Sequence, residues 1–533
     1  MEENKISNLN SSDDIINYIK DSTFNSQDIV YKELIIQDEK IHIVYDEPMV
    51  DTTTISDFVI RSIKNSVNEK IFENIDNKIE NFEEENNNTK ISLENKIEQK
   101  LKKLNKNTSK EIEQIVTNLE KIITIGKIKK LDLTQDDIFY YLFSGFTCVI
   151  YHTIIYAVNT RGNIDRSISE PTSEKNIKGP KDAFTENYQN NIGLIRKRIK
   201  SEKLVLEESK VGRRSKTKIG IMYIEDIARP NLVEYIKEKL KKINIDAILD
   251  SNYIMEILED SDKTDFPTMI STERPDLVSN MLLQGRLALI VENSPFVLII
   301  PAFITDFINN VEDYYQKNVN LFITKIIRYI AFFITIFTPA IYVALTTFDQ
   351  ETIPTQLLLS FTTQREGVPF PAFLEAFIMI VSFELLREGD FRIPNTGGST
   401  LSIVGALILG DAAVNAGIVS PIMIIVIAIT TISGLMFTDI NMANALRTWR
   451  FILLIFASMA GLVGVAVGLF LLIIKLASTT SATKPYTYPI APINLNSIMK
   501  NLFKRKNISN DTKRQKILTN NLTKYVKIKE QAK

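Results

Sequence analysis

The sequence predicts an α/β soluble N-terminal region made of two subdomains, followed by an all-α polytopic membrane domain. The membrane domain is indicated by residues 329–348, twenty consecutive residues without a charge, which is enough chain to cross a bilayer as one helix. Four further apolar stretches follow, at 368–386, 401–418, 421–438 and 451–474. The preceding residues instead alternate short apolar runs with charged amphipathic stretches, as a soluble α/β protein does.

Composition and charge exclude several classes of function. The 63 Lys and Arg nearly balance the 64 Asp and Glu, which argues against a nucleic-acid-binding protein. With one cysteine, Cys148, and two histidines, His42 and His152, neither an intrachain disulfide nor a zinc site is expected. We therefore expect no metal and no cofactor. The polar, acidic start of the chain lacks the pattern of a signal peptide, which favours a cytoplasmic N-terminal domain.

Shifts in composition divide the chain into five parts. In order, they are a charged, partly helical N-terminal extension, two α/β subdomains, a transmembrane domain with about four spans and one partial segment, and a basic cytoplasmic tail. The corresponding ranges are 1–125, 126–211, 212–318, 319–478 and 479–533.

The N-terminal extension contains two patterns. The alternating run YKELIIQDEKIHIVYDE, at 31–47, is typical of a hairpin. Residues 62–122 are rich in Asn, Lys, Glu and Ile, and EEENNNTK at 83–90 separates two stretches of helical spacing. Two helices with a polar break explain this composition, and so does a charged, partly disordered linker.

The two subdomains are expected to contain short strands and amphipathic helices. Residues 217–227 read as a strand, 231–243 as a helix with one apolar face, and 243–249 as the next strand, which predicts a parallel βαβ unit. The stretch LALIVENSPFVLIIP, at 287–301, predicts two strands joined by a turn. The basic loop GRRSKTK, at 212–218, is interpreted as the boundary between the subdomains. Because no Gly-rich phosphate loop follows these strands, no nucleotide site is expected.

Charge near the membrane segments sets the expected topology. From residue 500 onward the tail carries eleven Lys or Arg, which places it on the cytoplasmic side. If the N-terminal domain is also cytoplasmic, the number of complete crossings must be even. We therefore expect four full spans and assign the partial segment to 401–418, which is dense in Gly and Ala and ends before Pro421.

Polar side chains inside the apolar segments are the candidates for an ion pathway or a gate: Asp411, Glu375, Asn415 and Glu384. A carboxylate such as Asp411 costs about 2.5–3.5 kcal/mol at the centre of a membrane helix, so it should face a cavity or a partner. A cap on a helix turn near the interface explains Asp411 equally well. Glu384 and Arg387 have the spacing of an ion pair on one helix face, which a solvated helix end would also have.

Small residues in the last span, Gly461, Gly464 and Gly468, form a stripe typical of close helix packing within or between subunits. Pro339 is expected to kink the first span. Cys148 and His152 lie four apart in a strand-like stretch, where that spacing does not stack two side chains, so a buried structural cysteine is favoured over a nucleophile. We assign no catalytic residue.

Whole segments of the chain resemble one family. In the soluble region they are NTRGNIDRSISEP (159–171), FTENYQNNIGLIRKRI (184–199), GRRSKTKIGIMYI (212–224), TERPDLVSNMLLQGRLALIVENSPFVLIIP (272–301) and EDYYQK (312–317). In the membrane region they are REGVPFPAFLEAF (365–377), FELLREGDFRIP (383–394), SIVGALILGDAAVNAGIVSP (402–421) and PYTYPIAPINL (485–495). In this order, over about residues 130–500, the chain resembles the A subunits of the GerA family of spore germinant receptors.

The resemblance implies a multi-pass receptor subunit in the inner membrane of a bacterial endospore, with its N-terminal domain on the core side and its helices in membrane lipid. It implies germinant receptor B and C subunits as partners, a homo-oligomer, and a role in converting nutrient binding into ion release, without enzyme activity. The family often has an amide at the position of Asp411, so the acid here departs from the family pattern.

Two other classes of function compete with a receptor subunit. A single-chain solute transporter would show an internal hydropathy repeat and more spans. A membrane-anchored enzyme with a cytoplasmic α/β domain would need a cofactor loop or an acid/base constellation. The sequence shows none of these features.

Overall fold

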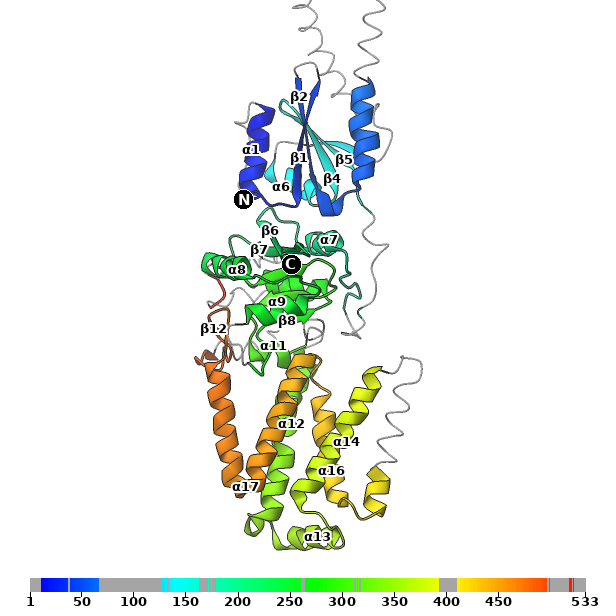
Figure 1. Cartoon of the computed structure of the whole chain (residues 1–533). Coiled ribbons are helices and arrows are strands. Elements are labelled where there is room, and N and C mark those ends of the chain that lie inside the picture. The colour runs from blue at the N-terminus through cyan, green and yellow to red at the C-terminus, as the bar shows by residue number, and fades with distance from the viewer. Residues whose placement is uncertain are drawn as a thin grey trace, which may run out of the picture.

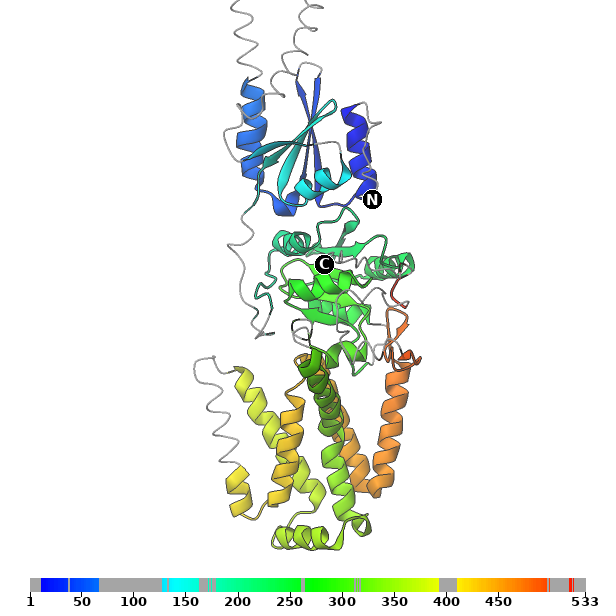
Figure 2. The ribbon, with the colours of Figure 1, turned by 180° about the vertical axis from the view of Figure 1, so that it is seen from behind.

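The computed structural model describes residues 11–36, 39–66, 127–131, 134–162, 171, 174, 179–259, 264–310, 313, 315, 318–392, 410–495, 498, 517–519 and 521. These residues form two α/β domains and a helical domain, which follow one another along the long axis of the molecule (Figures 1 and 2). The predicted fold class, two α/β subdomains followed by an all-α region of apolar helices, is confirmed.

The first domain is a five-stranded antiparallel sheet with helices on both faces. The strand order is β1-β2-β4-β5-β3, with β1 Ile29–Ile36, β2 Glu39–Asp46, β3 Ile128–Leu131, β4 Phe146–Tyr151 and β5 Ile154–Asn159. Helices α1 (Ser12–Ser22) and α6 (Gln135–Leu142) pack on one face, and the helical residues 52–66 pack on the other. Ser11 is the N-cap residue of α1, and its hydroxyl accepts a hydrogen bond from the amide of Asp14.

The predicted hairpin at 31–47 is confirmed, but it is not part of a separate extension. Strand β2 pairs with β4, and every residue of β4 is buried. A strand buried in this way needs hydrogen-bonding partners on both edges, and β2 and β5 supply them. The first domain therefore starts near residue 12 and not at the predicted residue 126, and the helical patterns predicted within 62–122 lie mostly outside the described residues.

The second domain is also a five-stranded antiparallel sheet between helices. The strand order is β6-β7-β9-β10-β8, with β6 Leu204–Val211, β7 Thr217–Ile224, β8 Ile270–Thr272, β9 Leu287–Val291 and β10 Val297–Ile300. Helices α7 (Tyr188–Arg198) and α10 (Pro275–Leu282) pack on one face. Helices α8 (Pro230–Lys242) and α9 (Ser251–Leu258) pack on the other face.

The predicted hairpin at 287–301 is confirmed, whereas the predicted parallel βαβ unit is wrong. Strand β7 and helix α8 form as expected, but residues 243–249 form no strand. The carbonyl oxygens of Ile245 and Asp246 accept hydrogen bonds from the amides of Arg213 and Arg214, at 2.9 and 2.8 Å. The segment thus closes the turn between β6 and β7, and the basic loop is a hairpin turn inside the second domain, not a domain boundary.

A buried ion pair joins the two α/β domains. The guanidinium of Arg196 on α7 donates to both carboxylate oxygens of Asp28, at 2.6 and 2.9 Å, and both side chains are fully buried. Next to Asp28, the amide of Gln27 donates to the carbonyl of Leu206, and the amide of Leu206 donates to the hydroxyl of Ser26. The chain before β1 therefore hydrogen-bonds directly to β6 across the domain boundary.

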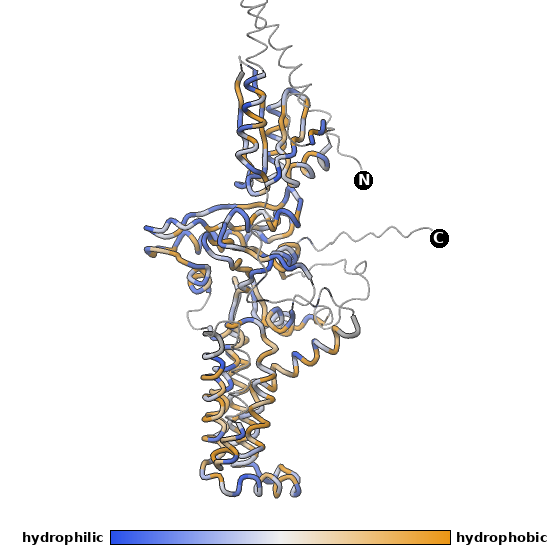
Figure 3. Tube along the Cα trace, turned by 90° about the vertical axis from the view of Figure 1, so that its right-hand side faces the viewer, coloured by the Kyte–Doolittle hydropathy of each residue, from blue (hydrophilic) through white to orange (hydrophobic). Residues whose placement is uncertain are grey.

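The helical domain contains α12 (Asn318–Thr347), α13 (Thr355–Arg365), α14 (Ala372–Arg392), α16 (Pro421–Gly434) and α17 (Ile440–Ser478). Residues Leu321–Thr347 of α12 and the whole of α17 are long and apolar enough to cross a membrane. Much of the trace of these helices is orange in Figure 3, the colour of hydrophobic residues. Large apolar side chains on them are exposed, among them Ile330, Phe333 and Phe470. Such a surface in water would be unusually large for a soluble domain, so it favours contact with lipid.

Helix α17 is a hairpin of two antiparallel arms, visible in Figure 1 below the second domain. Ala460 and Gly461 leave the helical conformation, and Gly461 has φ +60° and ψ −140°, which favours glycine. The predicted single span at 451–474 therefore reverses direction in its middle. A hydropathy profile does not show the reversal, because the two arms together form one continuous apolar stretch, as a single straight helix would.

The chain returns to the second domain after α17. Strands β11 (Thr480–Ser481) and β12 (Lys484–Pro485) form a small ladder, the hydroxyl of Ser481 donates to the carbonyl of Thr268 at 2.6 Å, and Tyr486 is fully buried. The segment predicted as the start of a basic tail is thus part of the second domain. The cluster of Lys and Arg from residue 500 lies almost entirely outside the described residues.

The joint between the α/β domains holds a second buried acid, Asp46, and neither of its carboxylate oxygens has a hydrogen-bond partner. Burial, together with the negative charge of Asp28, raises the pKa of Asp46 well above its ordinary value, although the charge of Arg196 opposes this. The folded chain therefore keeps a proton on Asp46 at pH values at which the unfolded chain has lost it.

From this pKa shift we predict that the joint loosens as the pH rises. The stability linked to Asp46 is complete below the unfolded-state pKa of about 4 and falls as the pH rises through the raised folded-state pKa. Hydrogen exchange at residues 26–46 of the whole chain, corrected for the intrinsic exchange rate, should show protection that declines with pH. The Asp46→Asn variant should lose this dependence, and the exposed control Asp226→Asn should keep it. A decline that persists in Asp46→Asn would exclude Asp46 as its cause.

Candidate functional site

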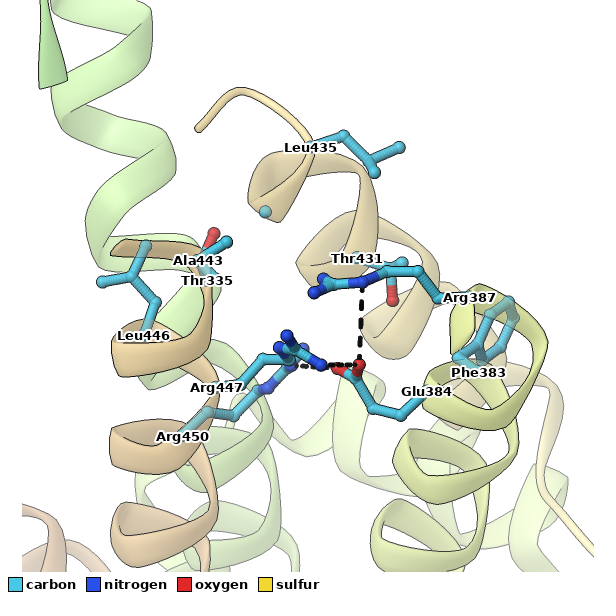
Figure 4. A pocket seen from close by; sticks show the side chains of 11 residues that line it. Thr335, Phe383, Glu384, Arg387, Thr431, Leu435, Ala443, Leu446, Arg447 and Arg450 are labelled. Atoms are coloured by element: carbon cyan, nitrogen blue, oxygen red, sulfur yellow. Dashed lines mark hydrogen bonds and ion pairs between the residues drawn. The ribbon is translucent and has the colours of Figure 1, made fainter. Parts of the chain in front are cut away.

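A cluster of charged side chains lies between the helices of the helical domain, at the end nearer the second domain (Figure 4). We call Glu384, Arg387, Arg447 and Arg450 the arginine cluster. The Glu384 carboxylate accepts hydrogen bonds from Arg447 at 2.7 Å and from Arg450 at 2.9 Å, one on each oxygen. Arg387, one turn further along α14, lies 3.9 Å from the same carboxylate.

Helix geometry brings these side chains together. Glu384 and Arg387 are three residues apart on α14, and Arg447 and Arg450 are three apart on the first arm of α17, so each pair faces the same way. The two pairs face each other across a small pocket, which α12 and α16 complete with Thr335, Thr431, Gly434 and Leu435. The predicted ion pair of Glu384 with Arg387 is present, but the shorter contacts come from α17.

Arg450 is the most deeply buried member of the cluster, with 4 % of its surface exposed. Its charge is matched by Glu384, yet the Nε–H groups of Arg450 and Arg447 have no acceptor. Breaking a buried ion pair by removing one partner costs about 3–5 kcal/mol. The cluster therefore joins α14 to α17, and two of its buried N–H groups have no hydrogen-bond acceptor.

Glu375, another predicted pathway residue, lies at the opposite end of α14 and is fully buried. Its Oε2 accepts hydrogen bonds from the amide and the hydroxyl of Ser420, at 2.9 and 2.8 Å, and its Oε1 lies 3.3 Å from Arg365. Ser420 is the N-cap residue of α16, where free amides and the helix dipole favour a negative charge. Glu375 thus joins α13, α14 and α16.

The structure does not bring Asp411 and Asn415 into either cluster. Both side chains are exposed, on the helical turn that precedes α16. Whether Asp411 acts in an ion pathway or as a cap therefore stays open. Half of the predicted partial segment 401–418, namely residues 401–409, lies outside the described residues.

The three glycines predicted to allow close packing lie at the α17 hairpin. A Cβ on Gly464 would overlap the carbonyl oxygen of Phe456, and a Cβ on Gly468 would overlap the side chain of Leu453. Both contacts are between the two arms of one chain. Gly461 lies at the reversal, where the carboxylate of Asp349 accepts a hydrogen bond from the amide of Leu462 at 2.8 Å and caps the second arm.

Sequence reasoning missed the ion pairs around the connection between the second domain and α12. Arg286, on the loop before β9, donates to both oxygens of Asp306 on α11 (Ile304–Ile308), at 2.7 and 3.0 Å. Arg328 on α12 donates to both oxygens of Asp313, at 2.9 and 2.8 Å. Asp306, Asp313 and Arg328 lie near the start of α12 in the sequence, and charges of both signs so close together could have indicated these ion pairs.

A further buried pair lies at the start of α10. Arg274 donates to both oxygens of Asp276, at 3.0 and 2.6 Å, and the hydroxyl of Tyr315 donates to Asp276 at 2.7 Å. Tyr315 belongs to the segment that leads into α12. The start of the helical domain is therefore held to the second domain by several charge-assisted hydrogen bonds.

The predicted structural role of Cys148 agrees with its surroundings. The side chain is fully buried in the sheet of the first domain, and burial raises the pKa of its thiol to about 12. The thiol is thus protonated and unreactive at neutral pH. Within the described ranges, no group of three or more His, Cys, Asp or Glu side chains is arranged to hold a metal ion.

A sequence profile of the family described as Bacillus/Clostridium GerA spore germination protein matches residues 17–517. The chain belongs to this family. Spore germination protein KA of Bacillus subtilis (strain 168) is 43 % identical over 388 residues, which cover 72 % of this chain and 71 % of the relative. Spore germination protein GerLA of Bacillus cereus is 36 % identical over 380 residues, which cover 71 % of this chain and 77 % of the relative.

One solved structure is also similar to this GerA-family chain. It is the crystal structure of the N-terminal domain of the A subunit of the Bacillus megaterium spore germinant receptor GerK3. The sequence identity is 30 % and the TM-score is 0.36, and the match covers 55 % of this chain and 96 % of that chain.

The family-like segments of the sequence include many of the ion-pairing residues of this GerA-family chain. The segment at 272–301 contains Arg274, Asp276 and Arg286, and the segment at 365–377 contains both Arg365 and Glu375. The resemblance therefore rests partly on residues that join one element to another.

We predict that Glu375 is required for the packing of α16 against α14. Glu375→Ala leaves the Ser420 amide and the Arg365 guanidinium without their partner and should lower stability by about 3–5 kcal/mol. Glu375→Gln keeps an acceptor for Ser420 and should cost less. Thermal unfolding of the detergent-solubilised chain measures both, with the exposed neighbour Glu366→Gln as control. Equal melting temperatures for Glu375→Ala and the control would exclude this role.

A second prediction concerns the α17 hairpin. Gly464→Ala places a methyl group against the Phe456 carbonyl and should destabilise the hairpin by about 1–3 kcal/mol. Gly389→Ala is the matched control, because a Cβ there meets nothing within 4 Å. The same unfolding measurement should show a lower melting temperature for Gly464→Ala alone. If both variants melt like the wild type, the two arms do not pack as described.

Proposed function

We propose that the chain is the A subunit of a nutrient germinant receptor in the spore inner membrane. In this proposal it crosses the membrane several times with its α/β domains on the core side, forms a homo-oligomer and acts with B and C subunits. It transduces nutrient binding on the complex into ion release and germination, and it is not an enzyme.

The observation that carries the proposal is the continuous packing between the second domain and the helices. One apolar core contains residues of the second domain and of the helical domain, among them Ile195, Val278, Phe307, Ile336 and Leu446. Such a core, together with the hydrogen bond of Tyr315 to Asp276 and the ion pair of Arg328 with Asp313, resists independent movement of the two domains. A change of state in one domain would therefore change the other, as a signal-transducing subunit requires.

The placement in a membrane rests on the apolar exterior of α12 and α17 and on the family. Both α12 and the second arm of α17 have one end against the second domain, and the Lys and Arg residues from residue 500 follow the second arm in the sequence. Basic segments of this kind favour the cytoplasmic face, which is the core side in a spore.

The pathway residues remain part of the proposal. Glu375 and Glu384 are held by ion pairs, so they would act by fixing or releasing helices. Asp411 and Asn415 are exposed on one chain and are therefore available to a neighbouring subunit or to ions.

The function is tested by exchanging the charges of the Asp313–Arg328 ion pair, which lies at the junction between the second domain and α12. Asp313→Arg and Arg328→Asp each place two like charges together and should slow nutrient-triggered cation release from spores at least tenfold. The double exchange Asp313→Arg/Arg328→Asp restores opposite charges and should recover part of the rate. Cation release and germination are measured on spores in which this receptor is the sole one present.

The exposed ion pair of Lys203 with Asp226 provides the matched control, because its exchange should leave release unchanged. Receptor abundance in the spore membrane is measured by immunoblot for each variant. Normal cation release from spores that contain either single junction variant at normal abundance would contradict the proposed coupling.

A further inference from the structure

The arginine cluster contains more positive charge than its carboxylate neutralises. Of the side chains that line its pocket, Arg387, Arg447 and Arg450 are cationic and Glu384 is anionic, and the negative charge of Glu388 also acts on Arg387, which leaves one net positive charge among these five groups. In addition, the Nε–H groups of Arg447 and Arg450 are buried without an acceptor. Buried donors and uncompensated charge are costly, so the pocket is suited to an anion that supplies both acceptors and charge.

The shape of the guanidinium group indicates which anion fits. Arginine presents its N–H donors in a planar fork that matches the spacing of phosphate oxygens. Three such groups converge on one small pocket from two helices, as Figure 4 shows. A phosphate group would accept from the free Nε–H donors while Glu384 keeps its own contacts with the Nη atoms.

The position of the pocket indicates where the phosphate comes from. It lies near the last turns of α14 and α16 and the first turns of α17, at the end of the helical domain that faces the second domain. Apolar side chains form part of its wall, and Leu435 at its edge is 67 % exposed. Basic pockets between membrane helices near the cytoplasmic surface suit the head groups of anionic lipids.

We infer that the arginine cluster binds one phosphate group, carried by an anionic phospholipid or present as free phosphate. The bound phosphate contacts Arg387 on α14 and Arg447 and Arg450 on α17. It lies on the opposite side of the arginine side chains from Glu384. The inference rests on the proposed placement of the helices in a membrane, but not on the proposed role in germination.

The single tryptophan of the chain gives a readout, because Trp449 precedes Arg450 in the sequence of α17 and its side chain is buried in the adjoining apolar core. Detergent-solubilised whole chain is titrated with phosphatidylglycerol whose acyl chains are brominated, and bromine quenches nearby tryptophan. Brominated phosphatidylcholine, which has no net charge, is the reference lipid. The wild type should be quenched at a lower mole fraction of phosphatidylglycerol than of phosphatidylcholine.

Two variants should move this preference in opposite directions. Arg447→Gln removes one cation and should weaken the binding of phosphatidylglycerol about fivefold. Glu384→Gln removes the competing negative charge and should strengthen it by a similar factor, even if the ion pairs with α17 weaken. The exposed Arg214→Gln, in the second domain, should behave like the wild type. If the arginine cluster were only a set of structural ion pairs, Glu384→Gln would not bind phosphatidylglycerol more strongly than the wild type.

The source of the phosphate is decided by a second titration, with inorganic phosphate alone, followed by the change in Trp449 emission. Preferential quenching by phosphatidylglycerol that is lost in Arg447→Gln identifies a lipid. Equal quenching by both lipids, together with a phosphate-induced emission change that is lost in Arg447→Gln, identifies free phosphate. The inference is overturned if neither ligand produces an effect, or if Arg447→Gln and Glu384→Gln respond like the wild type, as a pocket for a partner's acidic side chain would.

Discussion

The architecture depends on the matching of charges that the fold removes from water. A buried charge without a partner is very costly, so each such side chain fixes the position of the element that carries its partner. Asp28 and Arg196 fix the first domain to the second, Arg286 and Asp306 fix α11 beneath the second sheet, and Glu384 fixes α14 to α17. Apolar packing alone would allow these elements to slide, because dispersion and hydrophobic burial are not directional.

Sequence patterns predicted which segments form strands and helices more accurately than which of these segments contact one another. The hairpins at 31–47 and 287–301 were found because alternation and turn residues are local signals. The error at 243–249 has a physical cause, because a short apolar run predicts a strand whether its carbonyls bind a sheet edge or, as here, the turn between β6 and β7. The antiparallel order of the sheets was likewise not visible, since strands buried on both faces have similar sequences in either orientation.

The same limit applies to the candidate site. An acid inside an apolar stretch, such as Glu375 or Glu384, can be recognised from the sequence as costly and therefore as partnered. Its partner cannot be recognised, because Ser420 and Arg447 follow 45 and 63 residues later. Asp411 had the same local signal as Glu375, yet one is exposed and the other is fully buried. Helical spacing correctly indicated the faces of α14 and α17, and only the tertiary structure shows that these faces meet.

The hairpin form of α17 changes how a signal could travel through this chain. Both ends of a single membrane span cannot touch the same soluble domain, but both ends of a hairpin can. The first arm begins beside Phe437 and Met442, which lie in the core shared with the second domain. The second arm ends at Ser478 and leads directly to Ser481 and Tyr486, which pack inside that domain. A rotation of the second domain would therefore act on both arms together, while Asp349 holds their far end to α12. The first arm also contacts α14 through the arginine cluster, so a displacement of this arm would have to break or carry along the ion pairs of Glu384 with Arg447 and Arg450.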